Sequence, residues 1–314
     1  DRRQRQMCIR DSDNIMQLRR DGDDKKTFED PNTLVCFTCS PGAFIGINVV
    51  RKKKEGIMNK KNIIITAGPT NERIDSVMKI TNMSTGKLGA TVAEELLQEE
   101  DLGKLFYLSP KLAYKPKTKS EKLELISIES TIDLLKAIKK IISENKIFGV
   151  IHSSAVGDYY GEYTITGDQL ATSIAHKLSY QQLSEEEIKA IVLSMIEHPE
   201  IKTDNAHKIS SYEKNLMVKL GLTPKVIGHI KELDPNIILI GFKLLDGVSQ
   251  EELLQVASNL RDKNDADYIV ANNLAEIHNG MHKATILDQN GIYDQCETKQ
   301  EIAKSLRKIL FPQK

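Results

Sequence analysis

The stretch TNMSTGKLG, residues 81–89, gathers small and hydrogen-bonding side chains shortly after a β-branched apolar run at 62–66. Its Gly86-Lys87 pair is similar to the end of a Walker loop, which requires Gly, four residues and then Gly-Lys-Ser/Thr. Thr81 stands where the first glycine is required, and Leu88 stands where the hydroxyl is required. The G-x-G-x-x-G spacing of a dinucleotide site is also missing. The stretch is therefore neither of these two phosphate-binding motifs.

A helix that begins at about Gly86 still offers unpaired N–H groups and a favourable dipole to an anion. Asn82, Ser84 and Thr85 lie just ahead of this helix start and could add hydrogen bonds. The alternative is an ordinary capped helix without a ligand, and the stretch taken alone favours this alternative.

The elements that position this stretch alternate between strands and helices. Apolar runs predict strands at 62–66, 105–109, 123–128, 148–156, 237–245, 266–273 and 284–288. Amphipathic periodicity predicts helices at 87–99, 131–145, 249–264 and 298–310. This order requires right-handed crossovers and predicts an α/β fold, a Rossmann-like three-layer sandwich with a mainly parallel central sheet. The polar segment from 159 to about 205 is predicted to be a long connection with helical pieces.

Ligands of such sheets bind at the carboxyl ends of the strands, where loops lead into helices. Three loops are therefore candidates: AGPTNERIDSVMKITNMSTG (67–86), HSSAVGDYY (152–160) and GFKLLDG (241–247). All three are rich in Gly, Ser, Thr or Asn, so they can bring backbone N–H groups close to a ligand.

Composition excludes several function classes. The chain of 314 residues carries 44 basic and 44 acidic residues, so no net field favours nucleic acid or an anionic membrane surface. No apolar run is long enough to cross a bilayer, and the N-terminal residues lack the apolar core of a secretory signal. Four cysteines make a poor disulfide framework. We therefore expect a cytoplasmic protein.

Residues 1–57 do not share the alternating pattern, and we interpret them as a non-core extension that is disordered or not native. The Cys36-x-x-Cys39 pair lacks two further zinc ligands at suitable spacing, so no metal site is predicted. Lys53-Lys54-Glu55-Gly56 back-translates to a ribosome-binding sequence just upstream of an ATG. We hypothesise that the native protein starts at Met58, so that 58–314 forms a single domain. N-terminal mass determination tests this hypothesis.

Several separated segments together resemble the phosphopantothenoylcysteine synthetase family, and they follow the family's order from Asn62 to the C-terminus. They are ITAGPTNERID (65–75), ITNMSTGKLG (80–89), HSSAVGDYY, HKISS (207–211), LTPKVI (222–227), GFKLLDG and ADYIVANN (266–273). The combination KISS, TPK and GFKLL is most similar to the stand-alone ligases of Gram-positive bacteria. The resemblance implies an enzyme of coenzyme A synthesis that joins 4'-phosphopantothenate to L-cysteine through an acyl-nucleotide.

The resemblance also implies roles for individual residues. Asn82 matches the asparagine that contacts the acyl-nucleotide, and Lys208 matches an essential lysine that steadies the triphosphate. Asp158 matches the residue that reads the exocyclic amine of the base. The remaining nucleotide-binding positions implied in this way are Gly68, Thr70, Ser84, Thr85, Gly86, Ser154, Ala155, Phe242 and Lys263. Alone, a lysine such as Lys208 would be interpreted as a solvated surface residue, and Phe242 as a core residue. Asn273 stands where the family usually has Asp.

The resemblance further implies CTP as the bacterial co-substrate, Mg²⁺ with the triphosphate, a homodimer, and a flap between 159 and 207 that covers the substrate. ATP is the alternative nucleotide. An NAD(P)-dependent oxidoreductase is a rival class, but it requires the dinucleotide fingerprint and an acidic residue ending the second strand, and FYLSPK (106–111) offers neither. A non-catalytic sensor on the same fold would be expected to lose Asn82 or Lys208, and both are present.

Overall fold

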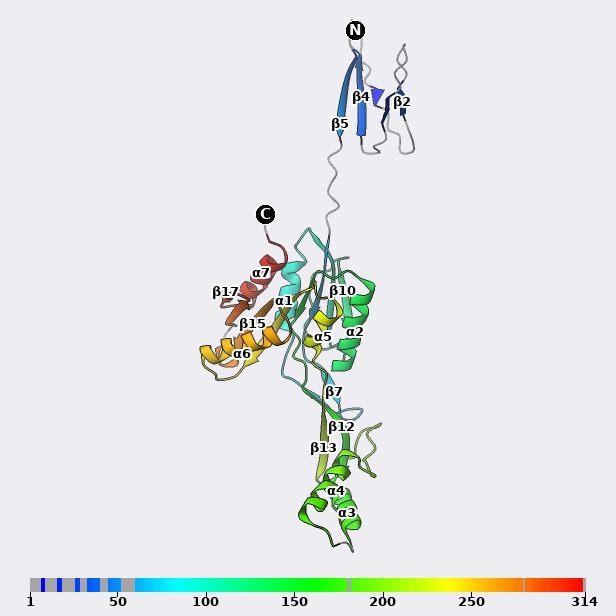
Figure 1. The fold of residues 1–314 in the computed structure, drawn as a ribbon, viewed down its shortest axis with the longest axis vertical. Coiled ribbons are helices and arrows are strands. Elements are labelled where there is room, and N and C mark those ends of the chain that lie inside the picture. The colour runs from blue at the N-terminus through cyan, green and yellow to red at the C-terminus, as the bar shows by residue number, and fades with distance from the viewer. Residues whose placement is uncertain are drawn as a thin grey trace. The chain divides into compact units, whose positions relative to one another are not determined.

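The computed structural model describes residues 60–179, 182–278 and 280–312, and five short strands within 1–59. The chain divides into two compact units, Asp1–Asn59 and Lys60–Lys314 (Figure 1). The boundary lies two residues after the one expected from the sequence.

In the first unit, an antiparallel sheet has the order β1 (Met7–Cys8), β4 (Thr33–Cys39) and β5 (Ile45–Arg51). β2 (Met16–Leu18) pairs with β3 (Lys26–Phe28). β4 and β5 pair along their whole length, from Thr33 opposite Arg51 to Cys39 opposite Ile45. The side chains of Cys36 and Cys39 lie outside the described residues, and the native status of this extension stays a prediction.

The second unit is built on a sheet of eight strands in the order β10-β9-β6-β11-β14-β15-β16-β17. The first six are parallel, and the last two are antiparallel to their neighbours. In chain order the strands are β6 (Lys61–Thr66), β9 (Leu102–Ser109), β10 (Leu123–Ser127), β11 (Gly149–His152), β14 (Ile238–Leu245), β15 (Tyr268–Asn273), β16 (Ala284–Asp288) and β17 (Gly291–Cys296). The predicted parallel sheet is confirmed, whereas β17 was not predicted.

Helices cover both faces of this sheet, because its central strands are apolar on both sides. Ile63 and Ile65 of β6 face a core shared with α1 (Lys87–Leu96) and α7 (Lys299–Leu310). Ile64 faces the opposite core, shared with α2 (Thr131–Glu144), α5 (Val226–Leu233) and α6 (Gln250–Lys263). All three isoleucines are fully buried. The three-layer, Rossmann-like sandwich expected from the sequence is confirmed.

Two antiparallel ribbons lie outside the main sheet. The hairpin β7 (Asn71–Arg73) and β8 (Lys79–Thr81) precedes α1, and β12 (Tyr159–Thr166) pairs with β13 (Leu216–Leu222). Between β12 and β13 the chain forms α3 (Gly167–Leu178) and α4 (Glu185–Glu197), at the end of the ribbon away from the sheet (Figure 1). The helical pieces expected here are confirmed. None of the helices in the described part of the chain has the length and apolar character that a membrane crossing requires.

Candidate functional site

The strand register brings the candidate loops to one edge of the sheet. His152, the last residue of β11, pairs with Thr66 of β6 on one side and with Gly241 of β14 on the other. Ala67 and Ser153 therefore leave the paired region at the same level, whereas β14 continues beside β15 to Leu245.

The loops after β6 and β11 are joined by a continuous set of hydrogen bonds. Ser153 Oγ donates to Thr66 O at 2.6 Å, and Ala155 N donates to Gly68 O at 2.9 Å. Thr70 N then donates to Ala155 O at 3.2 Å, and Thr70 Oγ1 accepts from Gly157 N at 2.8 Å. The two loops thus extend the pairing of β6 and β11 beyond the sheet as a single structure.

Glycines are required where this structure meets the start of α1. Gly68 and Gly86 both have φ of +78°, in the left-handed region that disfavours other residues. A Cβ at Gly86 would lie 3.2 Å from Gly68 N, and a Cβ at Gly68 would lie 2.7 Å from Ala113 Cβ. Gly86 precedes α1 without a side-chain cap, so the first N–H groups of this helix are not capped by that residue.

Asn82 connects the stretch before α1 with the loop after β11. Its Nδ2 donates to Ala155 O at 3.2 Å and to Val156 O at 3.1 Å, while the residue remains exposed. The side-chain oxygen Oδ1 has no partner among these contacts. The amide is therefore oriented by two backbone carbonyls from a loop far away in the sequence.

A cavity of about 290 Å³ lies at this edge. Asn82, Ser84 and Thr85 line one part of it, and Tyr114 closes another part. Its other lining residues are Pro69, Asn71, Lys79, Thr81, Pro110, Leu112 and Ala113. Lys87 Nζ lies 4.8 Å from the centre of the Tyr114 ring, so a cation lies beside the wall of the cavity.

Of the predicted residues, Gly68, Thr70, Gly86, Ser154 and Ala155 lie in the hydrogen-bonded loops behind this cavity. Ser154 N lies 3.3 Å from Thr66 Oγ1 and can donate to it. The buried Oγ of Ser154 has no hydrogen-bond partner among the described residues.

Like these five residues, the four other predicted residues, Asp158, Lys208, Phe242 and Lys263, do not line the cavity. Phe242 is half-buried on β14, where it packs against the core on the α1 side. Asp158 begins the turn into β12, and its carboxylate forms an ion pair with Lys225. Asp158 and Lys225 are both about two-thirds exposed.

Lys208 is exposed in the segment 202–215, and its neighbour Ile209 contacts Asp75 at the tip of the β7–β8 hairpin. Asn82 follows the other end of the same hairpin. Asp75 also accepts from Met78 N, and the four residues from Met78 to Asn82 span roughly 13 Å along the hairpin at about 3.3 Å per residue. Lys208 therefore belongs to a segment that contacts the tip of the hairpin, and it does not line the cavity.

Lys263 lies at the opposite edge of the sheet. It ends α6, and the chain then enters the amino end of β15, where Asp267 N donates to Leu239 O at 3.0 Å. Since Leu239 is near the amino end of β14, the end of α6 faces away from the carboxyl edge. The fold does not bring Lys263 together with the other predicted residues.

Two buried residues that sequence reasoning did not single out support the site. Thr66 Oγ1 lies 2.9 Å from His152 Nδ1, and both side chains are buried. Thr66 Oγ1 also accepts from Ser154 N at 3.3 Å, so the hydroxyl connects the ring to the loop after β11. Burial lowers the pKa of His152 from 6.5 to about 4, so the ring is neutral at physiological pH. The signal in the sequence was a histidine ending an apolar strand, which is usually a core residue.

Residues of the motif NERID (71–75) form hydrogen bonds that connect the hairpin to the start of α2. Glu72 Oε1 accepts from Thr131 N at 2.8 Å and lies 2.7 Å from Thr131 Oγ1. Asn71 Nδ2 donates to Glu129 Oε2 at 3.0 Å. Thr131 is fully buried, and Asn71 and Glu72 are nearly so. These contacts join residues about 60 positions apart, which no local pattern reveals.

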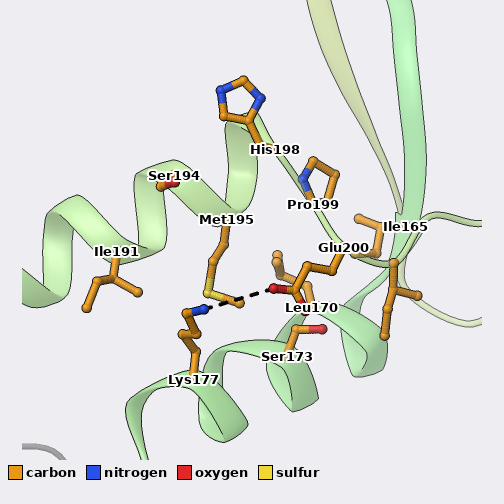
Figure 2. Close-up of a pocket in the computed structure, with 11 residues that line it drawn as sticks. Ile165, Leu170, Ser173, Lys177, Ile191, Ser194, Met195, His198, Pro199 and Glu200 are labelled. Carbon is orange, nitrogen blue, oxygen red and sulfur yellow. Dashed lines mark ion pairs between the residues drawn. The ribbon is translucent and has the colours of Figure 1, made fainter.

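A second cavity of about 160 Å³ lies between α3, α4 and the end of β12 (Figure 2). Figure 2 shows Leu170 of α3 and Met195 of α4 at this cavity, with Lys177 and Glu200 paired beside them at 4.0 Å. It contains none of the motif residues, so we assign the candidate site to the larger cavity at the sheet edge.

Residues 58–201 and 171–311 match the family described as the DNA/pantothenate metabolism flavoprotein C-terminal domain. The chain is 27% identical over 259 residues to the coenzyme A biosynthesis bifunctional protein CoaBC of Thermococcus kodakarensis, covering 82% of this chain and 53% of that protein. It thus spans about half the length of the curated relatives it matches.

Solved structures agree with this similarity. The DNA/pantothenate metabolism flavoprotein of Streptococcus pneumoniae is 32% identical, with a TM-score of 0.65, and the match covers 80% of this chain and 98% of that chain. The C-terminal domain of a CoaBC protein shares the fold, at 23% identity and a TM-score of 0.52 over 80% of this chain and 94% of that chain. The chain therefore belongs to the family of DNA/pantothenate metabolism flavoprotein C-terminal domains, the phosphopantothenoylcysteine synthetase family that its motifs resemble.

Proposed function

We propose that the protein is a phosphopantothenate–cysteine ligase of coenzyme A synthesis. It joins 4'-phosphopantothenate to L-cysteine with CTP and releases CMP and pyrophosphate. The observation that carries this proposal is the double contact of Asn82 with Ala155 O and Val156 O, which joins two motif segments at one cavity. Similarity to CoaBC proteins, which are named for coenzyme A biosynthesis, supports it.

The chemistry explains why such a site suits the reaction. An oxygen of the phosphopantothenate carboxylate attacks the α-phosphorus of CTP, and pyrophosphate leaves with the bonding electron pair. The cysteine amine then attacks the acyl carbon of the acyl-cytidylate, loses a proton, and CMP leaves. Several anions meet in the first step, so the protein must hold negative charge in a fixed arrangement.

The residues of the cavity can do this. Ser84 and Thr85 lie at the start of α1, where helix N–H groups and the two hydroxyls can bind phosphate oxygens, while Lys87 N donates to Thr85 Oγ1 at 3.4 Å. Asn82 is held by its donor side, so its Oδ1 is left to position a substrate donor such as the attacking amine. Lys87 adds positive charge beside Tyr114. We assign to Lys208 the role of steadying the triphosphate, from a segment that contacts the hairpin leading to Asn82.

Mg²⁺ is proposed to enter with the nucleotide. No cluster of three potential ligands from His, Cys, Asp and Glu occurs in the described part of the chain. Mg²⁺ in nucleotide enzymes is commonly held by substrate phosphates and water with few protein ligands, so MgCTP fits this donor set.

CTP is proposed because Asp158 can accept a hydrogen bond from the exocyclic amine of cytosine. Its ion pair with Lys225 must then open or be shared. Equal concentrations of CTP and ATP compared by initial rate decide this point, and faster turnover with ATP would overturn the choice.

The homodimer is proposed from the family resemblance and from exposed apolar side chains on the β12–β13 ribbon. Leu222 is 72% exposed and Tyr159 is 49% exposed. Analytical ultracentrifugation tests it, and a monomer at micromolar concentration would contradict it. The cytoplasmic location follows only from the proposed pathway and stays a prediction.

A pyrophosphate-release assay tests the ligase. With CTP and phosphopantothenate alone we expect a burst that does not exceed one pyrophosphate per site. Addition of cysteine should convert the burst into continuous release. Absence of release with all three substrates and Mg²⁺ would exclude the proposed function.

A further inference from the structure

Asp75 is a buried carboxylate at the tip of the β7–β8 hairpin, with 4% of its surface exposed. Its Oδ1 accepts from Val77 N at 2.7 Å and from Met78 N at 2.6 Å. These two bonds are local and close the hairpin turn. Its Oδ2 accepts from Ile209 N at 3.0 Å, across 134 positions of the sequence. The carboxylate therefore uses one oxygen for its own turn and the other for a distant segment.

Ile209 is the buried residue of the segment 202–215, which links α4 to β13. It is 5% exposed, whereas Lys208 and Ser210 on either side are exposed. The hydrogen bonds at Asp204 and Ser210 stay within the segment. Ile209 thus attaches the segment to the hairpin through its backbone N–H, and its apolar side chain is buried.

The contact with Asp75 fixes the residue next to Lys208. The preceding attachment of the segment is at Thr203, whose N donates to Thr164 O of β12 at 2.8 Å. Without the bond at Ile209, Lys208 would be five residues from this attachment. Hydrogen bonds from Met78, Ile209 and Val77, together with the charge of Lys208, lower the pKa of Asp75. The acceptor therefore stays ionised at physiological pH.

The hairpin connects this contact to the candidate site. β8 ends at Thr81, whose Oγ1 donates to Thr70 O at 3.0 Å, and Asn82 is the next residue. β12 packs on the hairpin so closely that a Cβ at Gly161 would lie 3.3 Å from Arg73 O. The hairpin is thus supported at its base and along its side.

We propose that Asp75 is a positioning residue that acts through Lys208: by binding Ile209 N it holds the Lys208 segment on the hairpin that carries Asn82. The proposal rests on the proposed function, in which Lys208 steadies the nucleotide phosphates. Asp75 itself contacts no substrate in this scheme.

Limited proteolysis tests the attachment without any activity measurement. In Asp75→Asn the side chain keeps one acceptor oxygen and places an NH₂ group where the second oxygen was. We expect trypsin to cleave after Lys208 about fivefold faster or more, because the segment opens more often. The matched control is Asp133→Asn, which alters a carboxylate that accepts from Ser130 N in the cap of α2. Equal cleavage of the wild type, the control and Asp75→Asn would overturn the proposal.

Kinetics of pyrophosphate release test the positioning. Asp75→Asn is expected to lower kcat by about tenfold to a hundredfold, the scale expected when a reacting geometry is misplaced by about 1 Å. The KM for cysteine should stay unchanged, since cysteine enters after the nucleotide step. In a Lys208→Ala background the same change should have an effect of less than about twofold, because the two residues act as one unit. Full additivity of the two effects would overturn the action through Lys208.

Ile209→Pro removes the donor from the other side and leaves Asp75 unchanged. If Asp75→Asn does not fold, the Ile209→Pro variant replaces it in the assay. Ile209→Pro should show the same loss of kcat. A folded Ile209→Pro protein with wild-type kcat would refute the proposal. If the wild type releases no pyrophosphate, the ligase assignment fails, and proteolysis alone still decides whether Asp75 holds the segment.

Discussion

Acidification to about pH 4.5 should destabilise the protein through His152, and the size of the effect follows from its burial. The ring ends β11, whose following loop Asn82 contacts, and its Nδ1 lies 2.9 Å from the buried Thr66 hydroxyl. Burial lowers its pKa from 6.5 to about 4. Protonation would place a positive charge in this buried position.

The sign and magnitude follow from proton linkage. In the unfolded chain, His152 becomes protonated near pH 6.5. In the folded protein it becomes protonated only near pH 4, because its pKa is lowered. The contribution to stability is therefore complete above about pH 6.5 and is lost as the pH falls toward about 4. A difference of this size corresponds to about 3 kcal/mol in total, of which about 2.5 kcal/mol is lost at about pH 4.5.

Other groups must be separated from this effect. The pKa of His282 is also lowered to about 4, by burial and then by the charge of Lys299. Protonation of His282 therefore also lowers the free energy of unfolding as the pH falls. Carboxylates with lowered pKa, such as Asp75, lose their contribution at lower pH still. The variant His152→Asn removes only the titration of His152 and retains an acceptor near the Thr66 hydroxyl.

The assay is urea unfolding of the wild type and His152→Asn at about pH 7 and about pH 4.5. The wild type should lose about 2 to 3 kcal/mol more than the variant over this interval. An NMR titration of the wild-type ring gives the same answer if the variant does not fold. Equal losses in both proteins, or a ring that titrates near pH 6.5, would refute the reasoning.

Three further substitutions probe the site. Asn82→Asp replaces the Nδ2 that donates to two carbonyls, so we expect the acyl-cytidylate to accumulate, and mass spectrometry that traps none would count against this role. Gly68→Ala meets Ala113 Cβ at 2.7 Å with φ at +78°, so urea unfolding should show a loss of about 1–3 kcal/mol; an unchanged midpoint would contradict the strain. Asn273→Asp loses the Nδ2 that donates to Val248 O at 2.8 Å, and a cost of about 1–2 kcal/mol is expected by the same method, whereas a stabilised variant would be incompatible with it.

The sequence predicted the parallel sheet well because continuous apolar runs are visible without knowledge of the fold. It missed β17 (Gly291–Cys296), whose residues are mostly exposed, and the two ribbons, whose pairing joins distant or short polar segments. It also missed α5, which begins directly after the motif LTPK. Such elements are stabilised by their neighbours rather than by their own periodicity.

For the site, the predicted parallel sheet made the loops after β6 and β11 candidates, because ligands bind at the carboxyl ends of parallel strands. The sequence did not predict the network around Glu72 and Thr131 or the contact of Asp75 with Ile209, because these bonds join residues far apart in the chain. Only some of the residues assigned from the family resemblance line the cavity. Asn82 lies at the cavity, whereas Lys263 lies at the far edge of the sheet, since a helix between parallel strands returns the chain to their amino ends.

The central claim is that a carboxyl group is converted into an ester of CMP at the Asn82 cavity. Phosphopantothenate labelled with ¹⁸O in its carboxylate tests this most directly, with mass spectrometry of the released CMP. One labelled oxygen should appear in the phosphate of CMP, because the attacking carboxylate oxygen stays on phosphorus when the amine displaces it. Unlabelled CMP formed together with the amide product would contradict the account.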